Sequence, residues 1–598
     1  MKKIYTLGCL ASLATLVSCS AFKISVPYEK EVHYVKLAKG QKKEDHEKFS
    51  KKISIVTQGS YASKAAYKVF KKGGNIIDAA TTASFVLAVE RPQSTGLGGG
   101  GFALYHDVKR NKDFPLTVDF REKAPLNAHE KMFLDDKGEV ISRMSIDGIF
   151  SAGVPGMVAG MIELHEKHGK LPLGVVLKDA IDLARNGFKI YPELAYAISR
   201  RENIIKRYKA TCEIFCNKKG EVLKEGDLLL QKDLAKTLEV ISKKGRDGFY
   251  KGRIAKSLVK EHRRLNGLMT QADLDKYDVK YRSPIRGEYN GYEIFSMSPP
   301  SSGGVHIIQI LNILRNDKLS TYGVQHSKTV HLRASAMQAA FSDRAKYLGD
   351  TDFTYVPVTG LTSQKYADDI RFSIPENKAL NTLWSNMNDP FKFDAKNDSE
   401  LVQKYESPET THFTIADGEG NVFVSTQTLN GYLGSGVVVP GTGILLNNEM
   451  DDFATKPGAN NLFGAVGGEK NLVEPEKRPL SSMSPTIVTK NGKAVLGLGS
   501  PSGTRILTCV VQTVMNYLDH KMPLYESIAA TRVHHQWKPN ILYVEESGLP
   551  ARTIKELKRM EHEIKFKKLG CRVQAVSMED GKLHGVSDPR GRGLVLGE

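Results

Sequence analysis

The sequence of 598 residues lacks most of the features that mark specialised classes of protein. It has only six cysteines and no spacing of histidine and cysteine typical of a zinc site, so no metal is expected. It has no internal repeats or low-complexity segments, and its 40% apolar and 25% charged residues argue against wholesale disorder. No nucleic-acid recognition motif accompanies the formal charge of +18, which is spread along the chain. A solvated basic surface is therefore favoured over a nucleic-acid binder.

Long apolar runs are also absent after the first residues, which predicts anchoring to a membrane rather than crossing it. Two lysines precede an apolar run from Ile4 to Val17, the layout of a secretory signal peptide. The run ends in LVSC at residues 16–19, which resembles the lipobox of bacterial lipoproteins, where the cysteine, here Cys19, becomes the lipidated first residue. The alternative is an ordinary signal cut after Ser20 or Ala21. Either way we expect an exported bacterial protein, in the periplasm or on the outer membrane.

The few cysteines leave a small number of possible disulfides. Cys9 is removed with the signal peptide, and four cysteines remain after Cys19. Export permits disulfides, and Cys212 with Cys216 could close a small loop. Scattered cysteines are as often unpaired and buried, so both interpretations stay open for these four: Cys212, Cys216, Cys509 and Cys571.

The chain is polar and rich in lysine up to about residue 50, and we predict that this segment is a tether. Folded structure is expected from about Ile53. Helical spacing follows at residues 61–70, and a small-residue run at 76–90 predicts a tightly packed buried helix. The glycine run at 96–101 satisfies G-x-G-x-x-G, but it leads into a strand rather than a helix. We therefore interpret it as a close approach of backbones, not a dinucleotide site.

Two β-rich runs flank a turn signal at residues 417–421, which predicts a hairpin over 406–430. Its first strand opens on Thr410 and Thr411, directly after a polar approach that reads as an exposed loop. Threonine is a poor nucleophile unless a base removes its proton. Cleavage before Thr410 would supply that base, because a free α-amino group has a pKa of roughly 7.7 to 8.0.

A second element with chemical potential lies near residue 500. A predicted strand at 494–498 ends in the turn Gly-Ser-Pro-Ser-Gly-Thr at 499–504, and a helical pattern follows at 505–518. Such a strand, turn and helix arrangement aims backbone N–H groups at whatever lies in front of it. The turn is therefore a candidate site for a developing oxyanion.

Several ordered motifs together resemble the γ-glutamyltranspeptidase family of N-terminal nucleophile hydrolases. They cover nearly everything after residue 50. The motifs are TTH at 410–412, TLN at 428–430, LLNNEMDDF at 445–453, RPLSSMSP at 478–485, HHQW at 534–537, GGNIIDAA at 73–80, the glycine run at 96–101, DFRE at 119–122, GVPG at 153–156 and SDPR at 587–590.

The resemblance implies an α/β protein with a four-layer αββα sandwich, made as one precursor that cuts itself. After an 18-residue signal peptide and a tether at 19–50, it implies a large subunit ending at Glu409 and a small subunit of residues 410–598. These form a heterodimer without a cofactor. Thr410 would attack the γ-glutamyl amide of glutathione or a related compound and pass the glutamyl group to water or to an amino acid or peptide. Autocleavage would lie between Glu409 and Thr410.

The family pattern also assigns roles to individual positions. Thr428 would orient the nucleophile, and Ser502 and Gly503 would supply the oxyanion loop. The predicted substrate residues are Arg121, Ser481 and Ser482 for the α-carboxylate, and Asn430, Glu449 and Asp452 for the α-ammonium. A pocket with a cation at one end and acids at the other suits a zwitterionic head group. This weighs against the alternative of a cephalosporin or glutaryl acylase, whose substrate lacks the amine, and a non-catalytic surface lipoprotein is the other alternative.

Two positions depart from the family pattern. The family usually has Gly-Gly where this chain has Ser502-Gly503, and the added β-carbon is expected to lower the rate or alter the acceptor. Many bacterial relatives carry a tyrosine in the lid over the glutamyl site, whereas the matching segment here offers Phe463. Phenylalanine can cover the pocket but cannot make the tyrosine's hydrogen bond.

Overall fold

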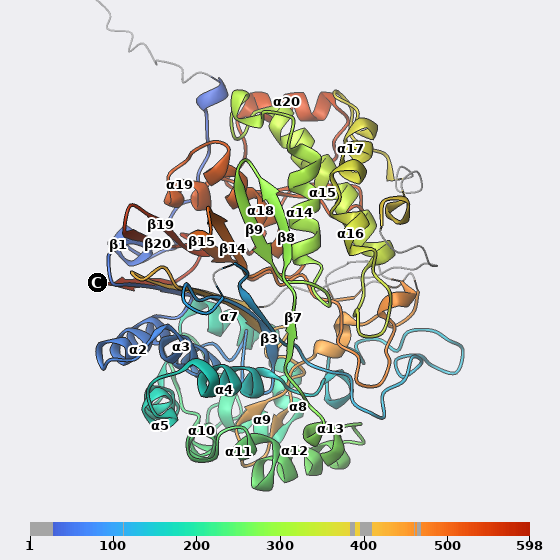
Figure 1. The fold of residues 1–598 in the computed structure, drawn as a ribbon. Coiled ribbons are helices and arrows are strands. Elements are labelled where there is room, and N and C mark those ends of the chain that lie inside the picture. Colours follow the sequence, from blue (N-terminus) through green and yellow to red (C-terminus); the bar gives the residue numbers. More distant parts are fainter. Residues whose placement is uncertain are drawn as a thin grey trace, which may run out of the picture.

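Two seven-stranded antiparallel sheets lie face to face at the centre of the molecule (Figure 1). The computed structural model describes residues 28–598 except 112, 383–388, 395–409, 458, 460 and 463–467. In the first sheet the strand order is β21-β2-β10-β11-β3-β4-β7. Its strands are β2 (Ile53–Thr57), β3 (Gly100–His106), β4 (Leu116–Phe120), β7 (Lys280–Arg282), β10 (Thr411–Asp417), β11 (Val422–Thr428) and β21 (Leu594–Gly597).

The second sheet has the strand order β1-β20-β19-β15-β14-β9-β8. Its strands are β1 (Glu47–Ser50), β8 (Ile285–Tyr289), β9 (Tyr292–Ser296), β14 (Thr486–Lys490), β15 (Lys493–Gly499), β19 (Gln574–Glu579) and β20 (Lys582–Ser587). Shorter strands lie outside the two sheets: β5 (Phe188–Lys189), β6 (Leu228–Leu229), β12 (Val438–Val439), β13 (Ile444–Leu445), β16 (Val533–His534), β17 (Leu542–Val544) and β18 (Ile564–Phe566).

Helices cover the outer face of each sheet and complete four layers. The first sheet carries α2 (Ser60–Lys71), α3 (Ile76–Glu90) and α4 (Met157–His168), and the second carries α14 (Gly303–Leu314), α15 (Ser327–Tyr347) and α18 (Arg505–Leu518). The predicted αββα sandwich is confirmed. The other α-helices are α1 (Lys43–His46), α5 (Leu173–Val176), α6 (Lys178–Asn186), α7 (Pro192–Arg200), α8 (Glu202–Arg207), α9 (Lys209–Phe215), α10 (Lys232–Lys244), α11 (Asp247–Tyr250), α12 (Gly252–Arg264), α13 (Gln271–Asp275), α16 (Val358–Leu361), α17 (Gln364–Ser373), α19 (Leu524–Ala529) and α20 (Ala551–Arg559).

Helix α3 shows how the sequence sets these layers. Its first turn is closed by a capping box, in which the Asn75 side chain accepts from the backbone of Asp78 and the Asp78 side chain accepts from the backbone of Asn75. All of its residues are buried, because small side chains let it pack closely against α2 and the sheet. The helix predicted from the small-residue run at 76–90 is therefore confirmed.

The two sheets pack tightly against each other at strand β15, which contacts β10 and β11. A side chain at Gly497 would lie 2.6 Å from Val422, and one at Gly499 would collide with the ring of His412. His412 is fully buried between the sheets, and burial lowers its pKa to about 3, so the ring is neutral. Its two nitrogens lie 2.8 Å from the Thr426 hydroxyl and 3.1 Å from the Thr414 hydroxyl. This contact brings the end of β15 next to the start of β10.

The folded domain begins earlier than the sequence predicts. Residues 43–50 form α1 and β1, and β1 pairs with β20 as an edge strand, so the prediction of a tether up to residue 50 is wrong for this segment. Phe49 stacks on His584 with ring centroids 4.0 Å apart, and Glu47 accepts from the same ring. Strand β1 could not be predicted from the sequence, because an edge strand keeps charged, exposed side chains and shows little apolar alternation.

Two disulfides are present among the described residues, Cys212–Cys216 and Cys509–Cys571. Cys212 and Cys216 are therefore paired with each other, and the alternative that they are unpaired is wrong. For the second, the sequence offered no partner, because the two cysteines meet only through the packing of α18 against the loop before β19. Within the part of the chain that the structure describes, no helix combines the length and apolar character needed to cross a membrane.

Candidate active site

The predicted hairpin is formed by β10 and β11. Thr410 lies directly before the first residue of β10. Thr411 pairs with Gln427, so the next position in register places Thr410 beside Thr428. Thr410 is buried, with 4% of its surface exposed. Glu409, the residue before the predicted cut, lies outside the described residues.

The loop after β11 turns sharply away from the sheet. Asn430 adopts a left-handed conformation (φ 74°), and its backbone N–H donates to the Thr428 hydroxyl at 2.7 Å. The Asn430 amide donates to the backbone carbonyl of Asn448 at 2.9 Å, and the Asn448 side chain accepts from the next backbone N–H, that of Gly431. Asn448 therefore joins the Thr428–Asn430 loop to the segment that carries Glu449. Asn448 was not predicted as a site residue, although it lies inside the motif LLNNEMDDF.

Arg121, Glu449 and Asp452 form one buried cluster of charges. Arg121 follows strand β4, and the two acids lie on a 3-10 helix at Glu449–Asp452. One guanidinium nitrogen, Nη2, lies 2.5 Å from Asp452 Oδ2, and the other, Nη1, bonds Glu449 Oε1. The guanidinium and the acids, predicted at opposite ends of the substrate, are thus in direct contact with each other. In this buried cluster Arg121 is the positively charged partner of both acids, and each acid needs such a partner while it stays buried.

Burial sets the protonation of this cluster. It raises the pKa of Asp452 to about 6, against the lowering effect of Arg121, and raises that of Glu449 well above its ordinary value. Burial lowers the pKa of Arg121, but the two carboxylates more than compensate and raise it, so the guanidinium stays charged. Burial also raises the pKa of the adjacent Glu122 to about 7. Glu122 was not predicted as a site residue, although it lies in the motif DFRE.

The two predicted serines are held by a neighbouring loop. Arg121 Nε donates to the carbonyl of Pro479, which brings the segment of Ser481 and Ser482 to the cluster. Ser302, just before α14, donates to the Ser481 carbonyl at 2.9 Å, and its hydroxyl lies 3.3 Å from that of Ser482. Arg344 on α15 donates to the Ser302 hydroxyl at 2.9 Å.

Arg344 also lies close enough to Asp452 to lower its pKa. Neither Ser302 nor Arg344 was predicted as a site residue, because Ser302 directly precedes α14, Arg344 lies within α15, and both are far from the motifs in sequence. A second guanidinium therefore lies near the cluster and is linked through Ser302 to the segment of the two predicted serines.

Ser502 and Gly503 lie in the loop between β15 and α18, as predicted. Both have left-handed backbones, with φ of 114° for Ser502 and 55° for Gly503. Glycine accepts such a conformation freely, whereas a serine there costs about 1–3 kcal/mol. The Ser502 hydroxyl donates to the carbonyl of Leu569 at 2.7 Å, which offsets part of that cost. The end of β15 contacts His412, so this loop lies at the same end of the sandwich as Thr410.

The predicted positions therefore gather at one end of the sandwich from distant parts of the chain. Arg121, Glu449 and Asp452 are in contact, the two serines adjoin them through Pro479, and Asn430 adjoins them through Asn448. Cys19, Glu409 and Phe463 lie outside the described residues.

Comparison with known proteins decides the family. The Gamma-glutamyltranspeptidase family profile matches residues 62–597, nearly the whole folded chain. The chain belongs to the γ-glutamyltranspeptidase family. The assignment predicted from the sequence motifs is confirmed, and with it membership of an enzyme family whose fold is that of the N-terminal nucleophile hydrolases.

Individual relatives and solved structures are similar to this chain over most of their own length. The chain is 42% identical over 547 residues to the glutathione hydrolase proenzyme of Escherichia coli K12, covering 90% of this chain and 91% of that protein. The structure of cephalosporin acylase from Bacillus halodurans superposes with a TM-score of 0.80 at 25% identity, covering 94% of this chain and 98% of that one. The structure of Helicobacter pylori γ-glutamyltranspeptidase is 42% identical with a TM-score of 0.54, covering 57% of this chain and 96% of that one.

Proposed function

We propose that this protein is a self-processing γ-glutamyltransferase and glutathione hydrolase. One observation carries the proposal: the buried Arg121–Glu449–Asp452 cluster is joined through Asn448 to the loop after the β10–β11 hairpin, in a chain with 42% identity to a glutathione hydrolase proenzyme. The cluster brings charges of both signs together, and the hairpin supplies the nucleophile.

Maturation begins with the hydroxyl of Thr410 attacking the carbonyl carbon of Glu409. The peptide C–N bond breaks, the nitrogen takes up a proton, and an ester joins the two residues. Water then hydrolyses the ester. The products are a large subunit that ends in the Glu409 carboxylate and a small subunit, residues 410–598, whose first residue carries a free α-amine.

The mature site uses that amine as its base. The α-amine of Thr410 takes the hydroxyl proton while Oγ attacks the γ-carbonyl carbon of the donor. The developing oxyanion is stabilised by backbone N–H groups of the Ser502-Gly503 loop. The amide C–N bond breaks, the leaving amine receives the proton, and a γ-glutamyl ester remains on Thr410. Water, or the amine of an amino acid or dipeptide, then attacks the ester and restores the enzyme.

The charges of the pocket select the donor. A glutamyl head group brings one carboxylate and one ammonium, so it can exchange the contact between Arg121 and the acids for two complementary contacts. Arg121 takes the carboxylate with Ser481 and Ser482, and the acids take the ammonium with Asn430. A head group without the amine would leave the acids with fewer partners in a site where unpaired charge is costly.

The test compares two anilides that differ only in that amine, γ-glutamyl anilide and glutaryl anilide. We expect kcat/KM to be at least about 100-fold higher for the glutamyl compound, because a buried charge-assisted contact is worth about 3 kcal/mol. Equal values, or a preference for the glutaryl compound, would make the protein an acylase. Release of aniline from neither compound by cleaved protein would leave only a binding module.

We propose in addition that the large subunit is anchored by a lipid on Cys19, in the periplasm or on the outer membrane. The support is the lipobox at residues 16–19. Cells grown with a labelled fatty acid should incorporate the label into the large subunit, and Cys19→Ala should abolish it. Cys9→Ala is the matched control and should retain the label. An unlabelled mature chain that begins after Ser20 or Ala21 would instead show an ordinary signal cut.

A further inference from the structure

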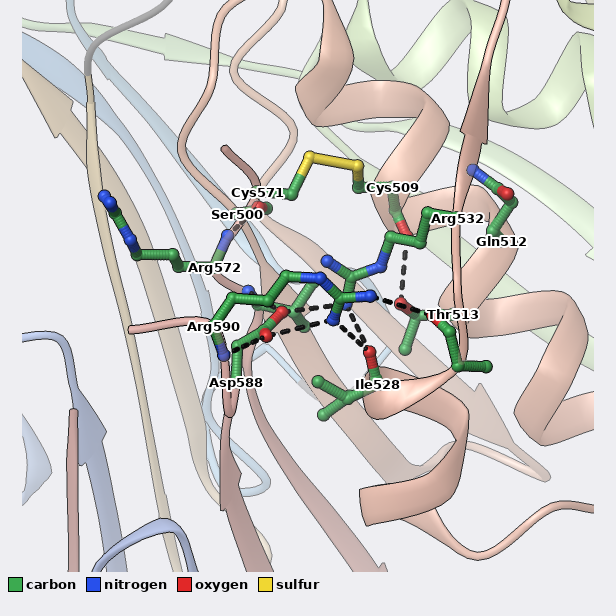
Figure 2. Close-up of polar contacts among 12 residues, drawn as sticks. Ser500, Cys509, Gln512, Thr513, Ile528, Arg532, Cys571, Arg572, Asp588 and Arg590 are labelled. Atoms are coloured by element: carbon green, nitrogen blue, oxygen red, sulfur yellow. Dashed lines mark hydrogen bonds and ion pairs between the residues drawn. A yellow bond between two sulfur atoms is a disulfide. The ribbon is translucent and has the colours of Figure 1, made fainter. Parts of the chain in front are cut away.

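A short segment near the C-terminus lies over the oxyanion loop. Residues 569–573, which we name the strap, precede β19 and contact residues 500–503 at two points. The Ser502 hydroxyl donates to the Leu569 carbonyl at 2.7 Å. The Arg572 backbone N–H donates to the Ser500 hydroxyl at 3.1 Å, a contact that Figure 2 shows. The strap therefore bonds both sides of the loop predicted to supply the oxyanion donors.

The strap is itself tied to two rigid parts of the small subunit. The disulfide Cys509–Cys571 joins its centre to helix α18, the helix that the oxyanion loop leads into. Figure 2 shows this disulfide directly beside the Ser500–Arg572 contact. Both cysteines are fully buried. A covalent link between the strap and α18 limits how far the strap can move from the loop.

The second anchor is the buried carboxylate of Asp588. It accepts from the Val573 backbone N–H at 3.0 Å. It is also paired with Arg532 at 2.8 Å and with Arg590 at 3.0 Å, as Figure 2 shows. Although burial raises the pKa of Asp588, the two guanidinium groups bring it below its ordinary value, so the carboxylate stays ionised. Asp588 and Arg590 belong to the SDPR motif, and through Asp588 this motif holds the end of the strap at Val573.

The backbone of Ser502 explains why the loop needs such support. Its φ of 114° suits glycine, and the serine is held there by the strap through its hydroxyl. Gly570 in the strap also has a left-handed backbone, and a β-carbon on it would lie 2.8 Å from the Ser502 hydroxyl oxygen. The close approach of strap and serine therefore depends on glycine at position 570.

We propose that the strap, locked by the Cys509–Cys571 disulfide, positions the N–H groups of the Ser502-Gly503 loop for catalysis, and that the Ser502 side chain transmits this positioning. The inference rests on the proposed function of that loop. A Gly-Gly turn would adopt this backbone conformation without strain. In this chain the bond from the Ser502 side chain to the strap holds the same conformation. The departure from the family pattern is thus compensated within the small subunit.

The first experiment removes the disulfide. In cleaved protein, Cys509→Ala with Cys571→Ala should lower kcat for γ-glutamyl anilide about tenfold, because displacing an oxyanion donor costs less than the roughly 100- to 1000-fold loss on deleting one. KM should stay within about twofold, because the glutamyl head group is bound elsewhere. Cys212→Ala with Cys216→Ala is the matched control and should leave kcat unchanged. A kcat within twofold of wild type in the Cys509 and Cys571 variant would overturn the inference, whatever its Tm.

The second experiment leaves the disulfide intact and so does not depend on the folding of the first variant. Ser502→Ala keeps the β-carbon but loses the hydroxyl, and should lower kcat about tenfold with KM unchanged. Ser502→Gly removes the backbone strain as well, and should retain more activity than Ser502→Ala. Equal activity of Ser502→Ala and wild type would contradict a role for the side chain. If wild-type protein itself releases no aniline, the proposed function fails instead, so the two failures are distinguishable.

Discussion

Thr410→Ala is expected to yield one uncut chain without amidase activity. The variant lacks the hydroxyl that attacks Glu409, so neither the cut nor the free α-amine can form. Activity on γ-glutamyl anilide should fall at least about 10⁴-fold, as when the nucleophile of other covalent catalysts is removed. Gel electrophoresis reports the uncut chain, and release of aniline reports the activity.

The neighbouring threonine provides a matched control. The hydroxyl of Thr411 donates to Gln58 Oε1 at 2.7 Å, and alternation along β10 places it on the opposite face of the strand from Thr410. Thr411→Ala should therefore still be cut between residues 409 and 410. Thr410→Ser should also be cut, because it keeps a hydroxyl at the same position. Two subunits from Thr410→Ala would refute the mechanism of maturation.

Arg121→Lys is expected to weaken donor recognition more than any other substitution that preserves charge. Lysine keeps the positive charge beside Glu449 and Asp452, so neither acid is left without a cation, but it loses the planar fork that binds two groups at once. We expect kcat/KM for γ-glutamyl anilide to fall about 100-fold, chiefly through KM, because two charge-assisted bonds are replaced by one. Steady-state kinetics of the cleaved variant measures this.

Arg478→Lys is the control for a buried guanidinium outside the pocket. Arg478 is as buried as Arg121 and pairs with Asp119 at 3.0 Å, so its loss should lower Tm without changing KM by more than about twofold. If Arg121→Lys lowered only Tm and left KM unchanged, Arg121 would be a structural residue and the assignment of the carboxylate site would be wrong.

Local signals in the sequence were sufficient to predict the elements around the nucleophile. A turn signal predicted the hairpin of β10 and β11, and a run of small residues predicted the buried helix α3. Helix α18 was predicted from the pattern of a strand followed by a turn and a helix. Each depends on residues that are close in sequence. The overall αββα arrangement and the family came instead from motifs distributed over the chain.

Contacts between distant segments could not be predicted in the same way. Arg121 and Glu449 are more than 300 positions apart, and their direct ion pair depends on how β4 and the 3-10 helix pack in the folded chain. The disulfide Cys509–Cys571 and the contact of Arg344 with Ser302 have the same origin. Strand β1 was missed for a different reason, because an edge strand needs few apolar side chains.

The most direct test of the account is the mass of the small subunit shortly after cleaved enzyme is mixed with γ-glutamyl anilide and quenched in acid. The account predicts a species heavier by one glutamyl group, with the added mass on the N-terminal peptide that begins at Thr410. It also predicts that an added dipeptide acceptor shortens the lifetime of that species. Unmodified small subunit throughout turnover, or the added mass on any other peptide, would contradict a γ-glutamyl ester on Thr410.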